Sequence, residues 1–385
     1  MIQWVLTRRA DPAIDGHRRR NHAVAQGGDP PLQLHSKHYA AYNVAAWQAI
    51  GSAMLVSGGV IQDRCSLARR QVLVSEGALR EERRVSQMAS WKRPHGVMVA
   101  LATPLKGDER VDEIGLRALV RRVLEGGVHG VVVLGSAGEF AALTDDEKVR
   151  AIEIVVDEVA GRVPVIAGTG EPSTVRALAM TRLAASIGAD AALVVPPYYY
   201  RLDQAAVLRH YRALASDGRL PIMLYHIPAF TKVSLEMDTV CRLAEEQSIV
   251  GLKDSGGSLG YFQRLVLEVR SEKFSVVTGS DDQFYASLAV GGDGNISPGA
   301  NLVPAWFVAL WLACRDKRWD EAWALQQKIM ILEKSVFKHG LFPANLKAAL
   351  ALLGIGQNVV TEPIVPLDDQ QMKDMESALR EAALL

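Results

Sequence analysis

A regular succession of short apolar runs constrains the fold more than any other feature of the sequence. Eight runs rich in Val, Ile and Leu follow one another from Gly96, and their starts lie 20 to 34 residues apart, the length of one strand–helix unit. Strands of almost continuous apolar content are typical of a parallel sheet buried on both faces. Eight such units predict a closed (β/α)8 TIM barrel. The predicted strands span residues 96–101, 130–134, 164–167, 191–195, 221–226, 249–253, 274–278 and 294–297.

Helical patterns fill the segments between these runs. In the first segment apolar residues recur at i, i+3, i+4, i+7 and i+8, which places them on one stripe of a helix. The next helix is predicted to begin at Thr144, because Thr144 and Glu147 have the spacing of a capping box. The stripe of the first helix is Leu116, Leu119, Val120, Val123 and Leu124. The apolar face predicted for the second is Val149, Ile152, Val156 and Val159.

After the eighth run the helical patterns continue without further strands, over residues 303–315, 319–334, 343–353 and 368–383. They predict a C-terminal helical layer packed beside the barrel. An open, dinucleotide-binding sheet would need G-x-G-x-x-G after its first strand, where Ala102-Thr103-Pro104 stands instead. The predicted organisation is therefore a catalytic barrel over residues 91–300 and packed helices over residues 301–385.

Residues 1–90 do not share this pattern. Residues 1–87 hold 12 Lys and Arg against 7 Asp and Glu, including the run Arg18–Arg20. Their apolar stretch, residues 39–61, contains Asn43, Gln48 and three glycines, which disfavours a membrane anchor or a signal peptide. We expect a poorly ordered or targeting extension, or a start codon placed upstream of the true one at Met88. The surplus charge lacks the aromatic residues or module expected of a nucleic-acid binder.

Composition narrows the partners and the compartment. The chain has 43 basic and 43 acidic residues, which gives no electrostatic reason for a nucleic-acid or membrane partner. Its 3 cysteines are odd in number and far apart, so neither a disulfide framework nor a metal cluster is indicated, and a cytoplasmic location is expected. Motifs for a serine nucleophile, a phosphate loop and a zinc site are absent, and the histidines are scattered as structural ones are.

Lys253 is the most informative residue for chemistry. In a TIM barrel the reacting groups stand at the carboxyl ends of the strands, and Lys253 ends the sixth run. Its amine is therefore predicted to lie inside the barrel mouth among apolar walls, where burial favours the neutral form. A neutral amine attacks a ketone to form an imine. The structural alternative is a lysine that reaches solvent or pairs with Asp254.

Two neighbouring features could assist such a lysine. Tyr225 ends the fifth run, where its phenol could carry protons, although a tyrosine at a strand end is more often a packing residue. The turn Gly135–Glu139 follows the second run; its glycines allow close approach of a ligand, and successive N–H groups could hold a carboxylate. An ordinary connecting turn is the alternative.

Taken together, the turn Gly135–Glu139, the run Tyr225–Pro228 and the run Gly251–Asp254 resemble the dihydrodipicolinate synthase / N-acetylneuraminate lyase family of class I aldolases. The resemblance covers residues 94–385. It implies that Lys253 forms a Schiff base with the substrate, that Tyr225 is the catalytic tyrosine and that Ser136 relays its proton. It also implies that the N–H groups of Ser136 and Ala137 bind the substrate carboxylate.

The resemblance extends to the assembly and to the rest of the site. Tyr199 matches a tyrosine that in many members reaches the neighbouring subunit's site, which implies a homo-oligomer, a dimer of dimers forming a homotetramer. No metal and no organic cofactor is expected, because the lysine itself supplies the electron sink. The residues expected to contact substrate are Thr103, Gly135, Ala137, Phe230, Gly279, Asp281, Asp282 and Ile296.

Departures from the family pattern bear on the substrate. Phe230 stands where the lysine-pathway synthases carry an arginine for the second substrate's carboxylate. Asp145, Pro172 and Arg176 stand where lysine-feedback ligands would be expected. Residues 279–282 resemble the stretch with which sialic-acid lyases bind sugar hydroxyls, and residues 138–140 and 251–257 resemble 4-hydroxy-2-oxoglutarate and 2-keto-3-deoxy-sugar-acid enzymes.

The sequence therefore predicts a Schiff-base lyase for a 2-oxo acid, most like a 4-hydroxy-2-oxoglutarate or 2-keto-3-deoxy-sugar-acid aldolase or dehydratase. The first alternative is 4-hydroxy-tetrahydrodipicolinate synthase, which joins pyruvate to aspartate semialdehyde. A catalytically silent barrel that serves as a scaffold or as a 2-oxo-acid sensor is the alternative of another class.

Overall fold

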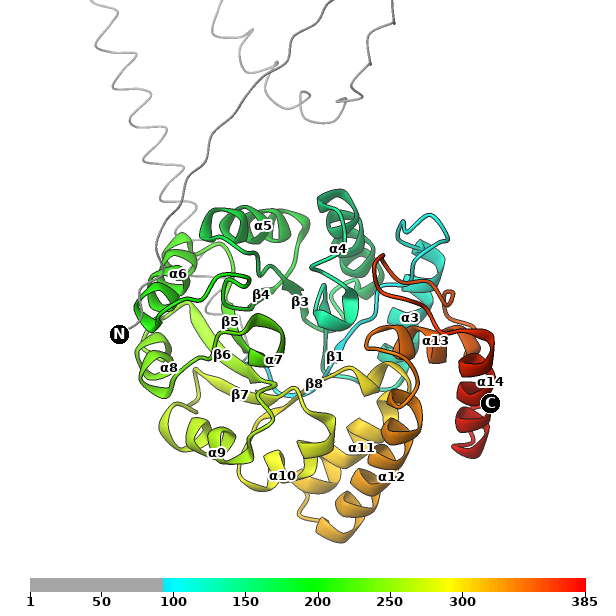
Figure 1. Ribbon diagram of the computed structural model, residues 1–385. Coiled ribbons are helices and arrows are strands. Elements are labelled where there is room, and N and C mark those ends of the chain that lie inside the picture. The colour runs from blue at the N-terminus through cyan, green and yellow to red at the C-terminus, as the bar shows by residue number, and fades with distance from the viewer. Residues whose placement is uncertain (1–92) are drawn as a thin grey trace, which may run out of the picture. The chain divides into compact units, whose positions relative to one another are not determined.

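The computed structural model describes residues 93–385, which contain a closed barrel of eight parallel strands (Figure 1). Each strand pairs with the next along the chain, and β8 returns to β1 with Gly294 opposite Gly96. The predicted fold class is confirmed. The strands are β1 Gly96–Ala100, β2 Gly130–Val133, β3 Val165–Gly168, β4 Ala191–Val194, β5 Ile222–His226, β6 Ile249–Asp254, β7 Ser275–Thr278 and β8 Gly294–Ser297.

Helices surround the barrel, and short turns of helix follow several strands at its carboxyl end (Figure 1). The helices of the outer ring are α3 Glu113–Glu125, α4 Asp145–Val159, α5 Thr174–Ile187, α6 Gln204–Asp217, α8 Met237–Ala244, α9 Leu259–Glu268 and α10 Phe284–Ala289. The turns after the strands are η1 Ser136–Gly138, α7 Pro228–Thr231, η2 Asp281–Gln283 and η3 Gly299–Asn301. These turns carry most of the residues predicted to react with or bind substrate.

The apolar stripe predicted for α3 is confirmed, with Leu116, Leu119, Val120 and Val123 fully buried. Burial of these side chains removes apolar surface from water and fixes which face of α3 rests on the barrel. Leu124, at the edge of the stripe, is only partly buried. The i, i+3, i+4 spacing is therefore sufficient to orient this helix.

The face predicted for α4 is rotated from the one observed, and its capping box forms only in part. The Thr144 side chain accepts a hydrogen bond from Glu147 N, but the Glu147 carboxylate accepts from Val111 N at 2.6 Å instead of from Thr144. Lys148 turns inward because its amine donates to Glu171 at 2.6 Å. The buried face is therefore Lys148, Ala151, Ile152, Val155 and Val159, whereas Val149 and Val156 are partly buried.

Four further helices form the predicted C-terminal layer, which gathers along one side of the barrel (Figure 1). In this layer α11 packs on β1 and α12, and α13 packs on α12 and α14. Every residue from Ala344 to Leu350 in α13 is buried, so this helix is the core of the layer. The four helices are α11 Pro304–Arg315, α12 Trp319–Phe337, α13 Ala344–Leu352 and α14 Asp369–Glu381.

The predictions for residues 1–90, including an extension, a targeting segment or a mis-assigned start, lie outside the described residues. Within residues 93–385, no helix combines the length and the apolar content that crossing a bilayer requires.

Candidate active site

Lys253 and Tyr225 lie side by side because β5 and β6 pair with these two residues in register. Both side chains are buried, with 3% and 4% of their surface exposed. The Lys253 amine donates a hydrogen bond of 3.1 Å to the Tyr225 hydroxyl and lies 4.2 Å from the centre of the ring. The sequence predicted apolar walls around this amine, whereas the structure gives it a phenol as a partner.

The alternative contact for the lysine, a pair with Asp254, does not form. Asp254 Oδ1 lies 2.8 Å from His226 Nδ1 and accepts a hydrogen bond of 2.9 Å from Gly256 N. Strand alternation explains this arrangement, since consecutive residues of β6 point to opposite faces of the sheet. Lys253 therefore faces the interior of the barrel mouth, and Asp254 with His226 supports the backbone behind it.

Gly279, one of the predicted substrate-binding residues, makes room for the lysine. A Cβ atom at position 279 would lie 2.6 Å from Lys253 Cε and 2.0 Å from Ser255 Oγ. Neither approach is sterically allowed, so any larger residue would displace the lysine side chain or the serine. The absence of a side chain at this position fixes the path along which the amine reaches Tyr225.

The surroundings of the Tyr225 phenol shift its pKa. Burial alone would raise its pKa. The charge of Lys253 and hydrogen bonds from Ser136, Ser255 and the lysine itself outweigh burial, so the pKa of the phenol falls below its ordinary value. Ser255 was not predicted as a site residue, although it stands two positions after Lys253 and hence on the same face. A proton can pass between amine and phenol across their direct contact.

The turn that carries Ser136 is anchored to the C-terminal layer. Glu139 ends this turn with a left-handed backbone (φ 57°) and a side chain that is fully shielded from solvent. Its carboxylate accepts from Lys347 Nζ at 2.5 Å, from Thr361 N at 2.7 Å and from Thr361 Oγ1 at 2.8 Å. Burial lowers the pKa of Lys347, and the charge of Glu139 opposes that effect. Thr103, predicted to contact substrate, donates to Gly138 O at 2.9 Å and supports the same turn.

Sequence reasoning missed Lys347 and Thr361. They stand more than 200 positions from Glu139 and belong to a helix and a loop with no chemical motif. The one available signal was Glu139 itself, an acidic residue inside a glycine-containing turn. An isolated buried carboxylate is so costly that a partner must exist, but the sequence does not say which cation supplies it.

Asp281 is folded into the wall of the barrel mouth. Its Oδ2 accepts from Gly299 N at 2.8 Å. Burial raises the pKa of Asp281 and of Glu333 in α12, and repulsion from the nearby Asp281 adds to the effect on Glu333. Asp282 is exposed, and Ile296 is buried in β8, so contact of these residues with substrate stays a prediction.

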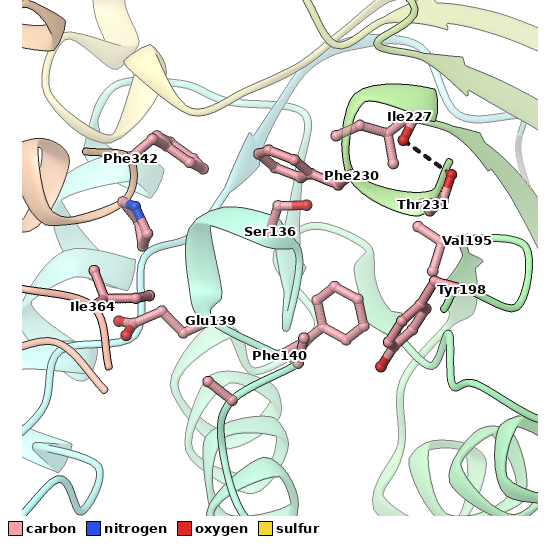
Figure 2. Close-up of a pocket in the computed structure, with 13 residues that line it drawn as sticks. Ser136, Glu139, Phe140, Val195, Tyr198, Ile227, Phe230, Thr231, Phe342 and Ile364 are labelled. Carbon is pink, nitrogen blue, oxygen red and sulfur yellow. Dashed lines mark hydrogen bonds between the residues drawn. The ribbon is translucent and has the colours of Figure 1, made fainter. Parts of the chain in front are cut away.

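A cavity of about 230 Å³ opens beside Ser136 (Figure 2). Ser136 joins it to the lysine, because the same serine bonds to the Tyr225 phenol. Phe230 borders the cavity, and 60% of its surface is exposed. The lining residues are Ser136, Glu139, Phe140, Ala141, Ala142, Val195, Tyr198, Ile227, Phe230, Thr231, Phe342, Pro343 and Ile364.

Tyr199 lies apart from this cavity. Its side chain is 87% exposed, its backbone is left-handed (φ 83°), and its ring meets that of Tyr200 edge-on at 5.1 Å. A large exposed aromatic ring on a strained backbone has no evident role within one subunit. Of the four predicted catalytic residues, the structure therefore brings together Lys253, Tyr225 and Ser136.

Arg176, which the sequence placed among the positions of lysine-feedback ligands, is engaged in ion pairs. Its guanidinium pairs with Glu171 at 3.1 Å and with Asp145 at 3.1 Å. The effector site itself stays a matter of prediction. Within residues 93–385 there is also no group of three His, Cys, Asp or Glu side chains suited to a metal ion.

A parallel (β/α)8 barrel with a buried lysine in contact with a tyrosine at its carboxyl end defines a lyase of the class I aldolase type. The chain belongs to the dihydrodipicolinate synthetase family, whose model matches residues 93–382. It is 38% identical to a 4-hydroxy-tetrahydrodipicolinate synthase of Phenylobacterium zucineum, over 75% of this chain and 98% of that protein. It is also 38% identical to an uncharacterized DapA-like lyase of Halobacterium salinarum, over 76% and 95% of the two chains.

Solved structures that superpose on this chain carry names from the same family. YagE of E. coli K12, a family member determined in complex with pyruvate, superposes with a TM-score of 0.73 at 30% identity, over 76% of this chain and 99% of that one. Dihydrodipicolinate synthase of Thermotoga maritima gives 0.73 at 32% identity, over 76% and 99%. These names support the predicted alternative, a 4-hydroxy-tetrahydrodipicolinate synthase, better than the predicted sugar-acid or hydroxyoxoglutarate aldolase.

The raised pKa of Glu333 makes stability depend on pH. A carboxyl whose pKa is raised in the folded state costs stability as pH rises above its unfolded value, near 4.5 for Glu333. We expect Glu333→Gln, which keeps a hydrogen-bond donor, to be more stable than wild type at pH 8 by on the order of 1 kcal/mol. The difference should shrink toward pH 5. Thermal unfolding at both pH values measures it.

The matched control is Glu321→Gln, on the exposed face of the same helix, where the change should be small at both pH values. An equal difference between Glu333→Gln and wild type at pH 5 and pH 8 would contradict the raised pKa of Glu333.

Proposed function

We propose that this protein is a Schiff-base lyase that makes or breaks a carbon–carbon bond next to pyruvate or a related 2-oxo acid, with Lys253 as the nucleophile. The observation that carries the proposal is the contact of the buried Lys253 amine with the Tyr225 hydroxyl at 3.1 Å. Family membership supports it, as does the bound pyruvate of YagE. The proposal retains Ser136 as the third catalytic group.

In the direction of synthesis, the amine of Lys253 adds to C2 of the 2-oxo acid, and loss of water gives a protonated imine. The imine draws electrons from the neighbouring carbon, so a proton leaves C3 and an enamine forms. C3 of the enamine then bonds to the carbonyl carbon of an aldehyde, whose oxygen takes up a proton from Tyr225. Water hydrolyses the imine and returns the free amine. Cleavage follows the same steps in reverse.

The turn η1 supplies the site for the carboxylate of the 2-oxo acid. Ser136 and Ala137 are the first residues of this helical turn, and N–H groups in a first turn have no partner within the helix. The substrate carboxylate would accept hydrogen bonds from these two groups. Gly135, immediately before them, keeps the approach open. This position sets C2 of the acid beside the lysine and the C4 oxygen beside Tyr225 and Ser136.

Tyr199 is the fourth predicted catalytic residue, and we propose that it acts across a subunit interface. Its 87% exposure and left-handed backbone suit a side chain that inserts into a partner's site. This role implies a homo-oligomer with the dimer as the smallest active unit.

Sedimentation measurements should find no active monomer, and Tyr199→Ala should lower kcat because the partner's site loses the inserted ring. A fully active monomer would contradict this part of the proposal.

The central prediction concerns Lys253. Pyruvate with borohydride should leave a reduced adduct on the peptide that contains Lys253, because the reductant traps the imine. Lys253→Arg keeps the positive charge but should abolish the adduct and the activity, since a guanidinium is not a nucleophile at neutral pH. Mass spectrometry of the digested protein locates the adduct.

Lys273→Arg, at an exposed position outside the site, is the matched control and should form the adduct normally. An adduct on another lysine would remove Lys253 from the mechanism. Binding of pyruvate without any adduct would favour the 2-oxo-acid sensor over the lyase.

A second candidate is 4-hydroxy-tetrahydrodipicolinate synthase, which the names of several relatives favour. It needs a site for the carboxylate of aspartate semialdehyde, and Phe230 offers no charged partner there. We therefore expect only slow condensation of pyruvate with aspartate semialdehyde. A coupled assay that reduces the cyclic product measures it, and turnover comparable to that of a known synthase would establish the second candidate.

A further inference from the structure

The cavity beside Ser136 is walled mainly by carbon atoms. Phe140 follows the Ser136 turn, Phe230 lies on α7, and Phe342 comes from the loop before α13 (Figure 2). Aliphatic side chains, among them Val195, complete the wall. The volume of about 230 Å³ is below that of drug-sized pockets, roughly 300–1,000 Å³. The cavity therefore suits one ring-sized group attached to a small acid.

Four side chains that line the cavity are polar, and two of them, Glu139 and Thr231, are already engaged by the protein; the other two are the hydroxyls of Ser136 and Tyr198. Both carboxylate oxygens of Glu139 are held by Lys347 and Thr361. Thr231 Oγ1 donates to Ile227 O or Val233 O, both at 3.1 Å. No lysine or arginine of residues 93–385 lines the cavity, so the hydroxyl of Ser136 is the polar group that faces both the cavity and the catalytic phenol.

Two of the three phenylalanine rings are held by other aromatic rings. Phe140 meets Tyr198 edge-on at 6.1 Å, and Phe342 meets Phe337 edge-on at 6.3 Å. Phe230 is instead 60% exposed, so its ring is available to a ligand. Edge-on and offset contacts with a further ring are favourable at these separations. The wall thus has two fixed rings and one accessible ring around the same space.

We infer that the aldehyde handled by this site carries a neutral aromatic ring, an inference that rests on the proposed Schiff-base function. A phenyl group would lose its contact with water against the three phenylalanines. A carboxylate here would be desolvated without a cation. The hydroxyls of a sugar chain would outnumber the two hydroxyls of the wall, those of Ser136 and Tyr198, and lose hydrogen bonds to water. The inference therefore departs from both the amino-acid and the sugar-acid substrates.

The chemistry needs no additional reagent. The enamine carbon of pyruvate bonds to the carbonyl carbon of benzaldehyde, the aldehyde oxygen receives the proton of Tyr225, and hydrolysis of the imine releases 4-hydroxy-2-oxo-4-phenylbutanoate. Cleavage returns pyruvate and benzaldehyde. In the product the ring is bonded to C4, the carbon that carries the hydroxyl. A C4 hydroxyl held at Ser136 and Tyr225 would therefore place the ring at the mouth of the cavity, which Ser136 lines.

The experiment compares benzaldehyde, glyceraldehyde and aspartate semialdehyde as acceptors for pyruvate with the full-length protein. We expect kcat/KM for benzaldehyde to exceed each of the others by about 10-fold or more, the range expected when apolar contacts decide between substrates. Phe230→Arg should lower the ratio of benzaldehyde to aspartate semialdehyde by about 10-fold, because it adds a partner for the carboxylate and removes a ring.

Leu267→Arg is the matched control, since Leu267 is 84% exposed on α9 and does not border the cavity. It should leave that ratio unchanged. If wild type forms the pyruvate adduct on Lys253 but prefers either polar aldehyde, the aromatic inference is overturned and the lyase proposal stands. If no adduct forms on Lys253, the proposed function itself fails. An equal change of the ratio in both arginine variants would also overturn the role of the cavity.

Discussion

The pairing of β5 with β6, which sets Tyr225 opposite Lys253, is the constraint on which the rest of the site depends. A buried ammonium without a partner would cost several kcal/mol, so the phenol is what allows a lysine at this position. The charge of Lys253 also keeps the pKa of the Tyr225 phenol below its ordinary value, although burial raises that pKa. Because the barrel is closed, neither strand can shift in register without disturbing its other neighbour.

The C-terminal helices are part of the site through a second buried pair. Lys347 of α13 and Glu139 of the Ser136 turn are both almost fully shielded, and Thr361 completes the coordination of the carboxylate. Removing one partner of such a pair leaves a buried charge and typically costs about 3–5 kcal/mol. The turn that carries Ser136 is therefore fixed by a layer that holds none of the residues predicted to be catalytic.

The fold could be predicted from the sequence because each barrel strand needs a continuous apolar run, and each helix needs a stripe of apolar residues along one face. The bounds of the strands and of α11 to α14 agree with those predicted within a few residues. The face of α4 was wrong because Lys148, a polar residue by its type, is drawn inward by Glu171 of a different segment. Lys253 and Tyr225 were identifiable because a polar residue that ends an apolar run has few structural reasons to be there. Glu333 and Lys347 were not, since their partners are set by tertiary packing.

The residues predicted to be catalytic and the wall of the cavity come from different parts of the chain. This separation limits what the names of the relatives imply about the substrate of this chain. Lys253 and Tyr225 stand at strand ends, whereas Phe230 lies on the short helix α7 and Phe342 on a loop of the C-terminal layer. A change in those connecting segments leaves the register of β5 and β6 intact. An identity of 38% to a synthase is therefore compatible with the proposed Schiff-base chemistry and a different aldehyde, because a change on α7 or in that loop can alter the wall of the cavity and leave Lys253 in place.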